Sequence, residues 1–167
     1  IVGQALRNLG VKRDDVVVAT KVFGQTGSGV NARGSSRYHI LGGVKASLTR
    51  LQLDHIDLYQ IHGFDPATPI EETLRALDDL IRQGKVRYIG CSNFPAWQVV
   101  EGQWTARTAG TNAFVSCQDE YSLVQREPER ELIPAARQYG MGLLPYFPLA
   151  SGLLTGKYRR NAPMPAG

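Results

Sequence analysis

Short apolar runs alternate with longer amphipathic stretches along almost the whole chain. Each run follows polar residues or glycine, and each is largely continuous rather than strictly alternating with polar residues. Such runs are typical of strands that are buried on both faces, as in a parallel sheet. The pattern predicts five strands, at residues 16–20, 56–61, 86–91, 113–117 and 141–146.

Four segments between these runs have the periodicity of amphipathic helices. Residues 38–52 and 69–83 each carry an apolar stripe, and residues 95–107 and 128–139 carry weaker ones. Residues 1–10 have the pattern of the last turns of a further helix, because apolar residues are already in stripe there. The chain is therefore predicted to alternate strands with helices.

The helix predicted at residues 69–83 has signals at both ends. Thr68 is expected to be its N-cap residue, with Pro69 at the first helical position and Glu71 completing a capping box. Gly84 lies just past the expected end, where glycine commonly terminates a helix.

Alternation of strands and helices indicates an α/β fold with a parallel sheet, for which two architectures compete. An open, doubly wound sheet of five strands fits 167 residues, whereas a (β/α)8 TIM barrel typically needs ~250. The predicted strands recur about every 30 residues, and eight such units give the barrel size. By this count the chain is a partial barrel over residues 1–167, with about five of eight strand-helix units and truncation at both ends.

Composition and charge exclude several classes of protein. The chain is 43% hydrophobic with a net charge of +4, which is ordinary for a globular domain, and its basic residues are interspersed with acidic ones. A nucleic-acid-binding face should show clustered positive charge, so no nucleic-acid partner is expected. No apolar run approaches the ~20 residues of a membrane span, and no secretion signal opens the chain. Cys91 and Cys117 match no metal spacing and no CxxC pair, so we expect reduced thiols in a cytoplasmic core and no metal site.

Candidate chemistry gathers where the predicted strands end. In both architectures ligands bind at the carboxyl ends of the strands. One such residue alone is more often structural, but all five predicted strands deliver a polar or aromatic side chain there. These residues are Lys21, His62, Ser92 with Asn93, Gln118 and Tyr146.

Two other motifs are set aside. The glycine-rich residues 24–29 are followed by Val30 and Asn31 rather than the Lys-Ser/Thr of a Walker A motif, and we interpret them as a loop over the mouth of a site. A nucleophile elbow would need glycine where Phe94 stands.

Several segments together resemble the aldo-keto reductase family. They are Ala19-Thr20-Lys21, residues 57–62, residues 84–94, Gln118 with residues 120–123, and residues 145–158. The resemblance covers nearly the whole chain in the family's order. It therefore implies the eight-stranded barrel, with this chain as its third to seventh strands and their helices.

The resemblance implies NAD(P)H-dependent reduction of small aldehydes or ketones to alcohols, and the reverse, with NADP(H) expected over NAD(H). The family uses a tetrad of Asp, Tyr, Lys and His. Lys21 matches the lysine that lowers the pKa of the tyrosine, so that the phenol can protonate the nascent alkoxide. His62 matches the histidine that orients and polarises the substrate carbonyl.

The resemblance also implies a cofactor site. Ser92, Asn93 and Gln118 match the groups that hold the nicotinamide carboxamide, and Tyr146 matches the aromatic residue on which the ring stacks. The following loop is expected to run along the pyrophosphate, with Lys157 as a counter-charge. Its candidate residues are Phe147, Pro148, Leu149, Ser151, Gly152 and Lys157.

The chain departs from the family pattern in three places. The tetrad Asp and Tyr are expected before the helix at residues 1–10, so the chain alone is expected to be catalytically silent. The segment that reads the adenosine 2′-phosphate would follow Gly167. Gly63 stands where arginine or a similar residue is frequent.

Barrels of this family also serve as cytoplasmic regulatory subunits of potassium channels, which is the alternative function. Such subunits commonly carry another residue at the position of His62. The histidine therefore favours an enzyme.

Overall fold

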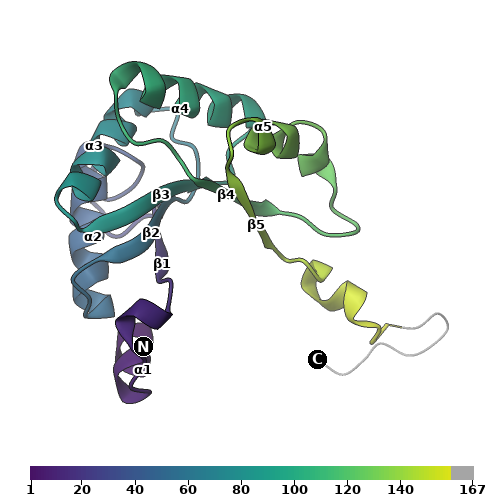
Figure 1. The fold of residues 1–167 in the computed structure, drawn as a ribbon, viewed down its shortest axis with the longest axis horizontal. Helices are drawn as coiled ribbons and strands as arrows, with labels where there is room; N and C mark the ends of the chain where they lie inside the picture. The colour runs from purple at the N-terminus through teal and green to yellow at the C-terminus, as the bar shows by residue number, and fades with distance from the viewer. Residues whose placement is uncertain (159–167) are drawn as a thin grey trace.

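The five strands lie side by side in one parallel sheet whose order follows the chain. The computed structural model describes residues 1–158, and every neighbouring pair of strands is parallel. The strands are β1 (Ala19–Val22), β2 (Ile56–Ile61), β3 (Val86–Ser92), β4 (Ser116–Glu120) and β5 (Gly142–Tyr146) (Figure 1). The prediction of adjacent, parallel strands in sequence order is confirmed.

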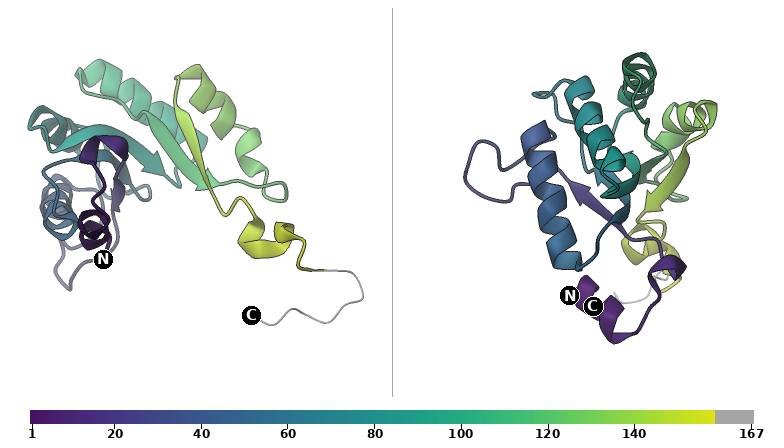
Figure 2. Two further views of the ribbon diagram at one scale, coloured as in Figure 1. Left: turned by 60° about the horizontal axis from the view of Figure 1, so that its bottom comes forward. Right: turned by 60° about the vertical axis from the view of Figure 1, so that its left-hand side comes forward.

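Helices cover one face of this sheet. They are α2 (Arg37–Leu51), α3 (Ile70–Arg82), α4 (Ala96–Ala109) and α5 (Leu132–Gln138), which follow the convex side in chain order (Figures 1 and 2). A short helix, α1 (Val2–Asn8), packs against the end of α2. Strands and helices thus alternate as in part of a (β/α)8 barrel. Within residues 1–158, no helix is long and apolar enough to cross a membrane.

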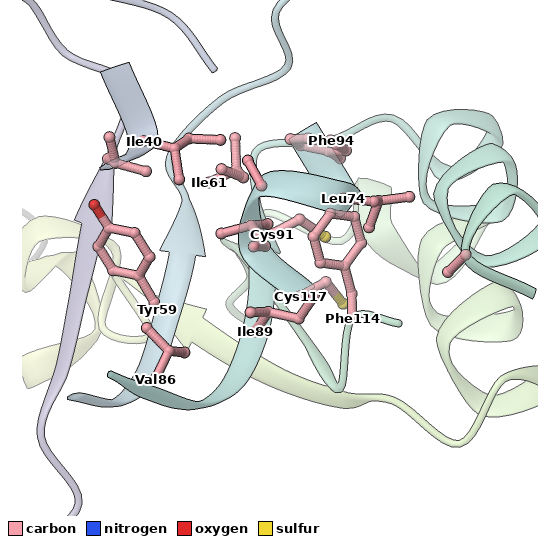
Figure 3. Packing of buried hydrophobic residues seen from close by; sticks show 14 of the residues in the cluster. Ile40, Tyr59, Ile61, Leu74, Val86, Ile89, Cys91, Phe94, Phe114 and Cys117 are labelled. Carbon is pink, nitrogen blue, oxygen red and sulfur yellow. The ribbon is translucent and has the colours of Figure 1, made fainter. Parts of the chain in front are cut away.

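The hydrophobic core lies between the convex face of the sheet and the helices. Tyr59 and Ile61 of β2 and Ile89 of β3 are fully or almost fully buried there, against residues such as Leu74 of α3 (Figure 3). Cys91 and Cys117 are registered neighbours in this core, and both are free. Burial raises the pKa of the Cys117 thiol to about 11 and that of Cys91 well above its ordinary value, so both thiols stay protonated.

The concave face of the sheet has no helix over it among the described residues. Tyr88 of β3 is 60% exposed and Leu144 of β5 is 40% exposed. Both belong to the registered rows of this face, because Tyr88 pairs with Leu58 and Leu144 pairs with Gln118. In a closed barrel these rows form the packed interior.

Strands β1 and β4 begin three residues later than the apolar runs predict. Residues 13–15 form a 3-10 turn (η1, Arg13–Asp15), and the Val18 amide donates to the Asp57 carboxylate at 2.7 Å instead of joining the ladder. Before β4, Phe114 packs in the core against Phe94, with ring centroids 5.9 Å apart, and does not belong to the strand. Both ladders then continue into polar residues, which the apolar pattern could not include.

The helix ends also differ from prediction. Thr68 does not cap α3, because its hydroxyl donates to Asp65 Oδ2 at 2.8 Å, and Pro69 is the N-cap residue. The same Asp65 oxygen accepts the Ser35 amide at 2.8 Å, which ties the loop after β2 to the start of α2. The segment predicted as one helix at 128–139 divides into a 3-10 turn (η2, Glu127–Glu129) and α5.

Two adjacent glycines of α2 provide a test of this packing. A Cβ on Gly43 would lie 2.9 Å from Val22 Cγ2 and 3.0 Å from the Tyr59 hydroxyl, whereas one on Gly42 meets nothing within 4 Å. We expect Gly43→Ala to destabilise the fold by roughly 1–3 kcal/mol through overpacking. We expect Gly42→Ala to stabilise it by about 1 kcal/mol, because alanine is the better helix former. Thermal unfolding of both variants measures the difference, and equal shifts would contradict the packing.

Candidate active site

The strand register brings Lys21 and His62 to the same face and the same end of the sheet. Lys21 pairs with Gln60, and His62 lies two residues beyond Gln60, so both side chains project on the concave side. Lys21 is the third residue of β1 rather than following the strand, and it is half-buried. His62 directly follows β2 and is exposed.

The surroundings of His62 favour its neutral form. Partial desolvation of the imidazole lowers its pKa, and the positive charge of Lys21 lowers it further. A neutral imidazole can donate one hydrogen bond to an acceptor such as a carbonyl oxygen.

Hydrogen bonds through Asn93 join the ends of four strands. Its Nδ2 donates to the His62 carbonyl at 3.0 Å and to Ser92 Oγ at 3.1 Å. Its Oδ1 accepts from the Tyr146 hydroxyl at 2.8 Å. The Ser92 hydroxyl in turn donates to the Gln118 carbonyl at 2.8 Å. We call these five residues the rim network.

Gln118 lies inside β4 rather than after it, and its register partners are Ser92 and Leu144. Its side chain is half-buried and makes no hydrogen bond to another of residues 1–158. The amide is therefore available to a ligand at the rim.

The loop after β5 extends beyond the sheet, away from the helices (Figures 1 and 2). Phe147 contacts the Tyr146 ring edge to face, with centroids 5.4 Å apart, and Lys157 Nζ lies 5.1 Å from the centroid of the Tyr158 ring. The structure does not bring the rest of this segment to the rim network. Its predicted residues lie in or beside the 3-10 segment η3 (Ala150–Thr155) and are Pro148, Leu149, Ser151, Gly152 and Lys157.

Sequence reasoning missed one titratable residue beside the site. Asp119 lies on the opposite side of β4 from Gln118, and its Oδ2 is buried without a hydrogen-bond partner among the described residues. It lines a cleft of about 560 Å³ together with Phe94, Arg130 and Leu132. Burial raises the pKa of this carboxyl to about 6. A polar residue at a helix-facing position of a strand was the signal available in the sequence.

Asp119 should make stability depend on pH. Because its pKa is raised from an ordinary 3.8 to about 6, the folded state holds the proton more tightly than the unfolded state. The contribution to stability is thus present at low pH and is lost as the pH rises through about 6. We expect Asp119→Asn to stabilise the protein at about pH 7.5, by at most about 3 kcal/mol, and much less at about pH 4.

Melting temperatures of wild type and Asp119→Asn at the two pH values measure this effect. Glu120→Gln is the matched control, because it removes the exposed carboxylate next in the chain. A stabilisation by Asp119→Asn of the same size at both pH values would show that ionisation is not its cause.

A parallel sheet in chain order with its helices on one face (Figure 1) is the arrangement of part of an α/β barrel, in which the carboxyl ends of the strands form the mouth. The chain belongs to the aldo/keto reductase family, whose model matches residues 1–167.

Individual relatives carry different functional names. The chain is 43% identical over 163 residues to a probable voltage-gated potassium channel subunit beta of Arabidopsis thaliana, covering 97% of this chain and 49% of the relative. It is 44% identical over 161 residues to an uncharacterized oxidoreductase of Bacillus subtilis, covering 94% and 49%. It is 40% identical over 172 residues to a putative aryl-alcohol dehydrogenase of Saccharomyces cerevisiae, covering 93% and 50%. The chain thus spans about half the length of these curated relatives.

Proposed function

We propose that the protein to which this chain belongs is an oxidoreductase that interconverts small aldehydes or ketones and alcohols with a nicotinamide cofactor. Membership of the family and the oxidoreductase names of relatives support the reaction class. One observation carries the proposal. Lys21 of β1 and His62, which follows the neighbouring strand β2, project from the same face of the sheet near its carboxyl end, beside the rim network. We infer NADP(H) rather than NAD(H) and a cytoplasmic location from the family resemblance alone.

The chemistry of the rim residues supports a nicotinamide site. The free amide of Gln118 and the remaining lone pair of Asn93 Oδ1 complement the C=O and N–H groups of a carboxamide. The Tyr146 ring supplies an aromatic surface next to them. When bound, the cofactor supplies the hydride that reaches the carbonyl carbon.

The chain's own residues then act on the carbonyl oxygen. Neutral His62 donates a hydrogen bond to that oxygen and so fixes the direction of the carbonyl. The Lys21 ammonium favours the ionised form of the family's tyrosine, which lowers the pKa of that tyrosine and eases its proton transfer to the alkoxide. Each turnover thus moves one hydride to carbon and one proton to oxygen.

We further propose that residues 1–167 are the third to seventh strands, with their helices, of a complete barrel that we call the parent protein. Two findings support this: the chain spans about half of its relatives, and β1 and β5 each have a strand neighbour on one side only within residues 1–158. The tetrad Asp and Tyr would then lie in the preceding strands of the parent protein.

The relative named as a potassium channel subunit favours a second function, a regulatory subunit that binds cofactor without efficient turnover. The two functions differ in a single assay. Purified parent protein is mixed with NADPH and small aldehydes, and oxidation of the cofactor is followed by absorbance, with NADH in parallel. Aldehyde-dependent oxidation supports the reductase. Binding of NADPH without turnover supports the regulatory subunit, and absence of binding overturns both.

A further inference from the structure

We propose that the Tyr146 hydroxyl is a positioning group, which fixes the side chain of Asn93 so that it recognises the carboxamide of a dinucleotide. This inference rests on the proposed function, because it assigns a task within the same cofactor site. It concerns the hydroxyl of Tyr146 and not its ring.

The contact crosses a strand. Tyr146 is the last residue of β5, and Asn93 follows β3, so the phenol passes over the carboxyl end of β4 to reach Asn93 Oδ1 at 2.8 Å. The two residues are 53 positions apart in the chain. The Tyr146 ring is itself held by its edge-to-face contact with Phe147. The hydrogen bond of the hydroxyl is thus accompanied by a second contact of the same side chain, through its ring.

The partners of Asn93 determine which way its amide faces. The His62 carbonyl can only accept, so the Nδ2 side must face it, at 3.0 Å. The Oδ1 side then faces Tyr146, whose neutral hydroxyl donates. Burial raises the pKa of Tyr146, and the nearby carboxylates of Glu120 and Asp119 raise it further, so the hydroxyl keeps its proton.

This arrangement limits what Asn93 can offer a ligand. Both protons of Nδ2 are used by the His62 carbonyl and Ser92 Oγ, which leaves one lone pair of Oδ1. Asn93 is exposed and has a left-handed backbone with φ of 56°, so without the Tyr146 contact its side chain is held from one side only. The fixed Oδ1 selects an N–H donor, which is the group that a carboxamide presents.

Tyr146→Phe in the parent protein isolates the hydroxyl, because phenylalanine keeps the ring. We expect the Kd for NADPH, measured by fluorescence, to rise about five- to tenfold, the loss of one net hydrogen bond. For a reduced dinucleotide with an acetyl group in place of the carboxamide, the Kd should change less than about twofold, because that ligand has no N–H for Asn93 to recognise.

A double-mutant cycle and a matched control complete the test. In an Asn93→Ala background, Tyr146→Phe should have no further effect on the Kd for NADPH. Tyr121→Phe is the control, because its hydroxyl donates to Glu129 at 2.7 Å outside the rim network, and it should leave the Kd unchanged.

The outcomes separate the two proposals. Wild-type affinity of Tyr146→Phe, an equal loss for both dinucleotides, or a full effect in the Asn93→Ala background would each overturn this inference and leave the proposed function intact. Failure of the wild-type parent protein to bind either dinucleotide would overturn the proposed function, and this inference with it.

Discussion

Lys21→Met in the parent protein should lower kcat by about 10²–10⁴-fold, the range expected when acid-base catalysis is removed. The Kd for cofactor should stay within about twofold, because in the proposed mechanism Lys21 acts on the pKa of the proton donor, and it does not belong to the rim network. The loss would then be confined to the transition state. Steady-state kinetics with a small aldehyde, together with cofactor titration, measures both quantities.

A second readout of this variant does not depend on catalysis. The charge of Lys21 is one of the two causes that lower the pKa of His62, after desolvation. Lys21→Met should therefore raise the pKa of His62, as followed by NMR of its imidazole. Lys45→Met, which removes a lysine from the exposed surface of α2, is the matched control and should change neither kcat nor the His62 titration. An unchanged His62 pKa in Lys21→Met would show that the two side chains do not face each other.

The strands that the sequence predicted accurately are those whose apolar run coincides with the ladder. For β2, β3 and β5 the observed bounds agree with the predicted ones to within one residue. For β1 and β4 the ladder is displaced toward the carboxyl end, where Lys21 and Gln118 carry the candidate chemistry. The pattern of apolar residues reports which positions are buried, whereas a strand is defined by its hydrogen bonds to neighbouring strands. The bounds given by these two criteria differ where a strand continues into a polar site.

The candidate site was predicted as a set of strand ends, but not as a network. Strand order and the carboxyl-end rule suffice to bring His62, Ser92, Gln118 and Tyr146 to one rim. The bond from Tyr146 to Asn93 depends on the phenol reaching across β4, which no local pattern records. The cleft beside Asp119 likewise arises where the start of α4, the end of β4 and the segment from η2 to the start of α5 come together, and only coordinates show that the Asp119 Oδ2 lacks a partner among the described residues.

Some backbone conformations near the candidate site could not be predicted from the residue types. Asn93 and three residues after β5 adopt left-handed φ angles without being glycine. Asparagine tolerates this conformation, but for other residues with a side chain it costs about 1–3 kcal/mol and persists where the surroundings enforce it, often at a ligand site. The three residues are Phe147 (φ 51°), Ala150 (φ 48°) and Ser151 (φ 52°). These residues lie in the loop that the family resemblance assigns to the cofactor pyrophosphate.

The 167-residue chain on its own should show no aldehyde-dependent oxidation of NADPH under conditions in which the parent protein turns over. On the proposal above, the proton donor and its Asp partner would lie in the parent's preceding strands, and loss of a general acid alone costs roughly 10²–10⁴-fold. The open concave face should lower the activity further. Tyr88 and Leu144 are exposed there, so the rim lacks the interior packing that would hold it rigid and align the hydride with the carbonyl. Within residues 1–158, β1 and β5 each have one edge without a strand neighbour, and such edges also favour association between copies.

Chain and parent protein are assayed side by side at equal concentration, with size-exclusion chromatography of both to separate inactivity from aggregation. The flanking sequence supplies an independent check, since a tyrosine followed by a glycine-rich turn is expected shortly before Ile1. Comparable rates from chain and parent would show that the proton donor does not come from the preceding strands, and would contradict the proposed mechanism. An upstream segment without such a tyrosine would instead predict a parent that binds cofactor without turnover. It would then favour the regulatory subunit over the reductase as the function of the parent protein.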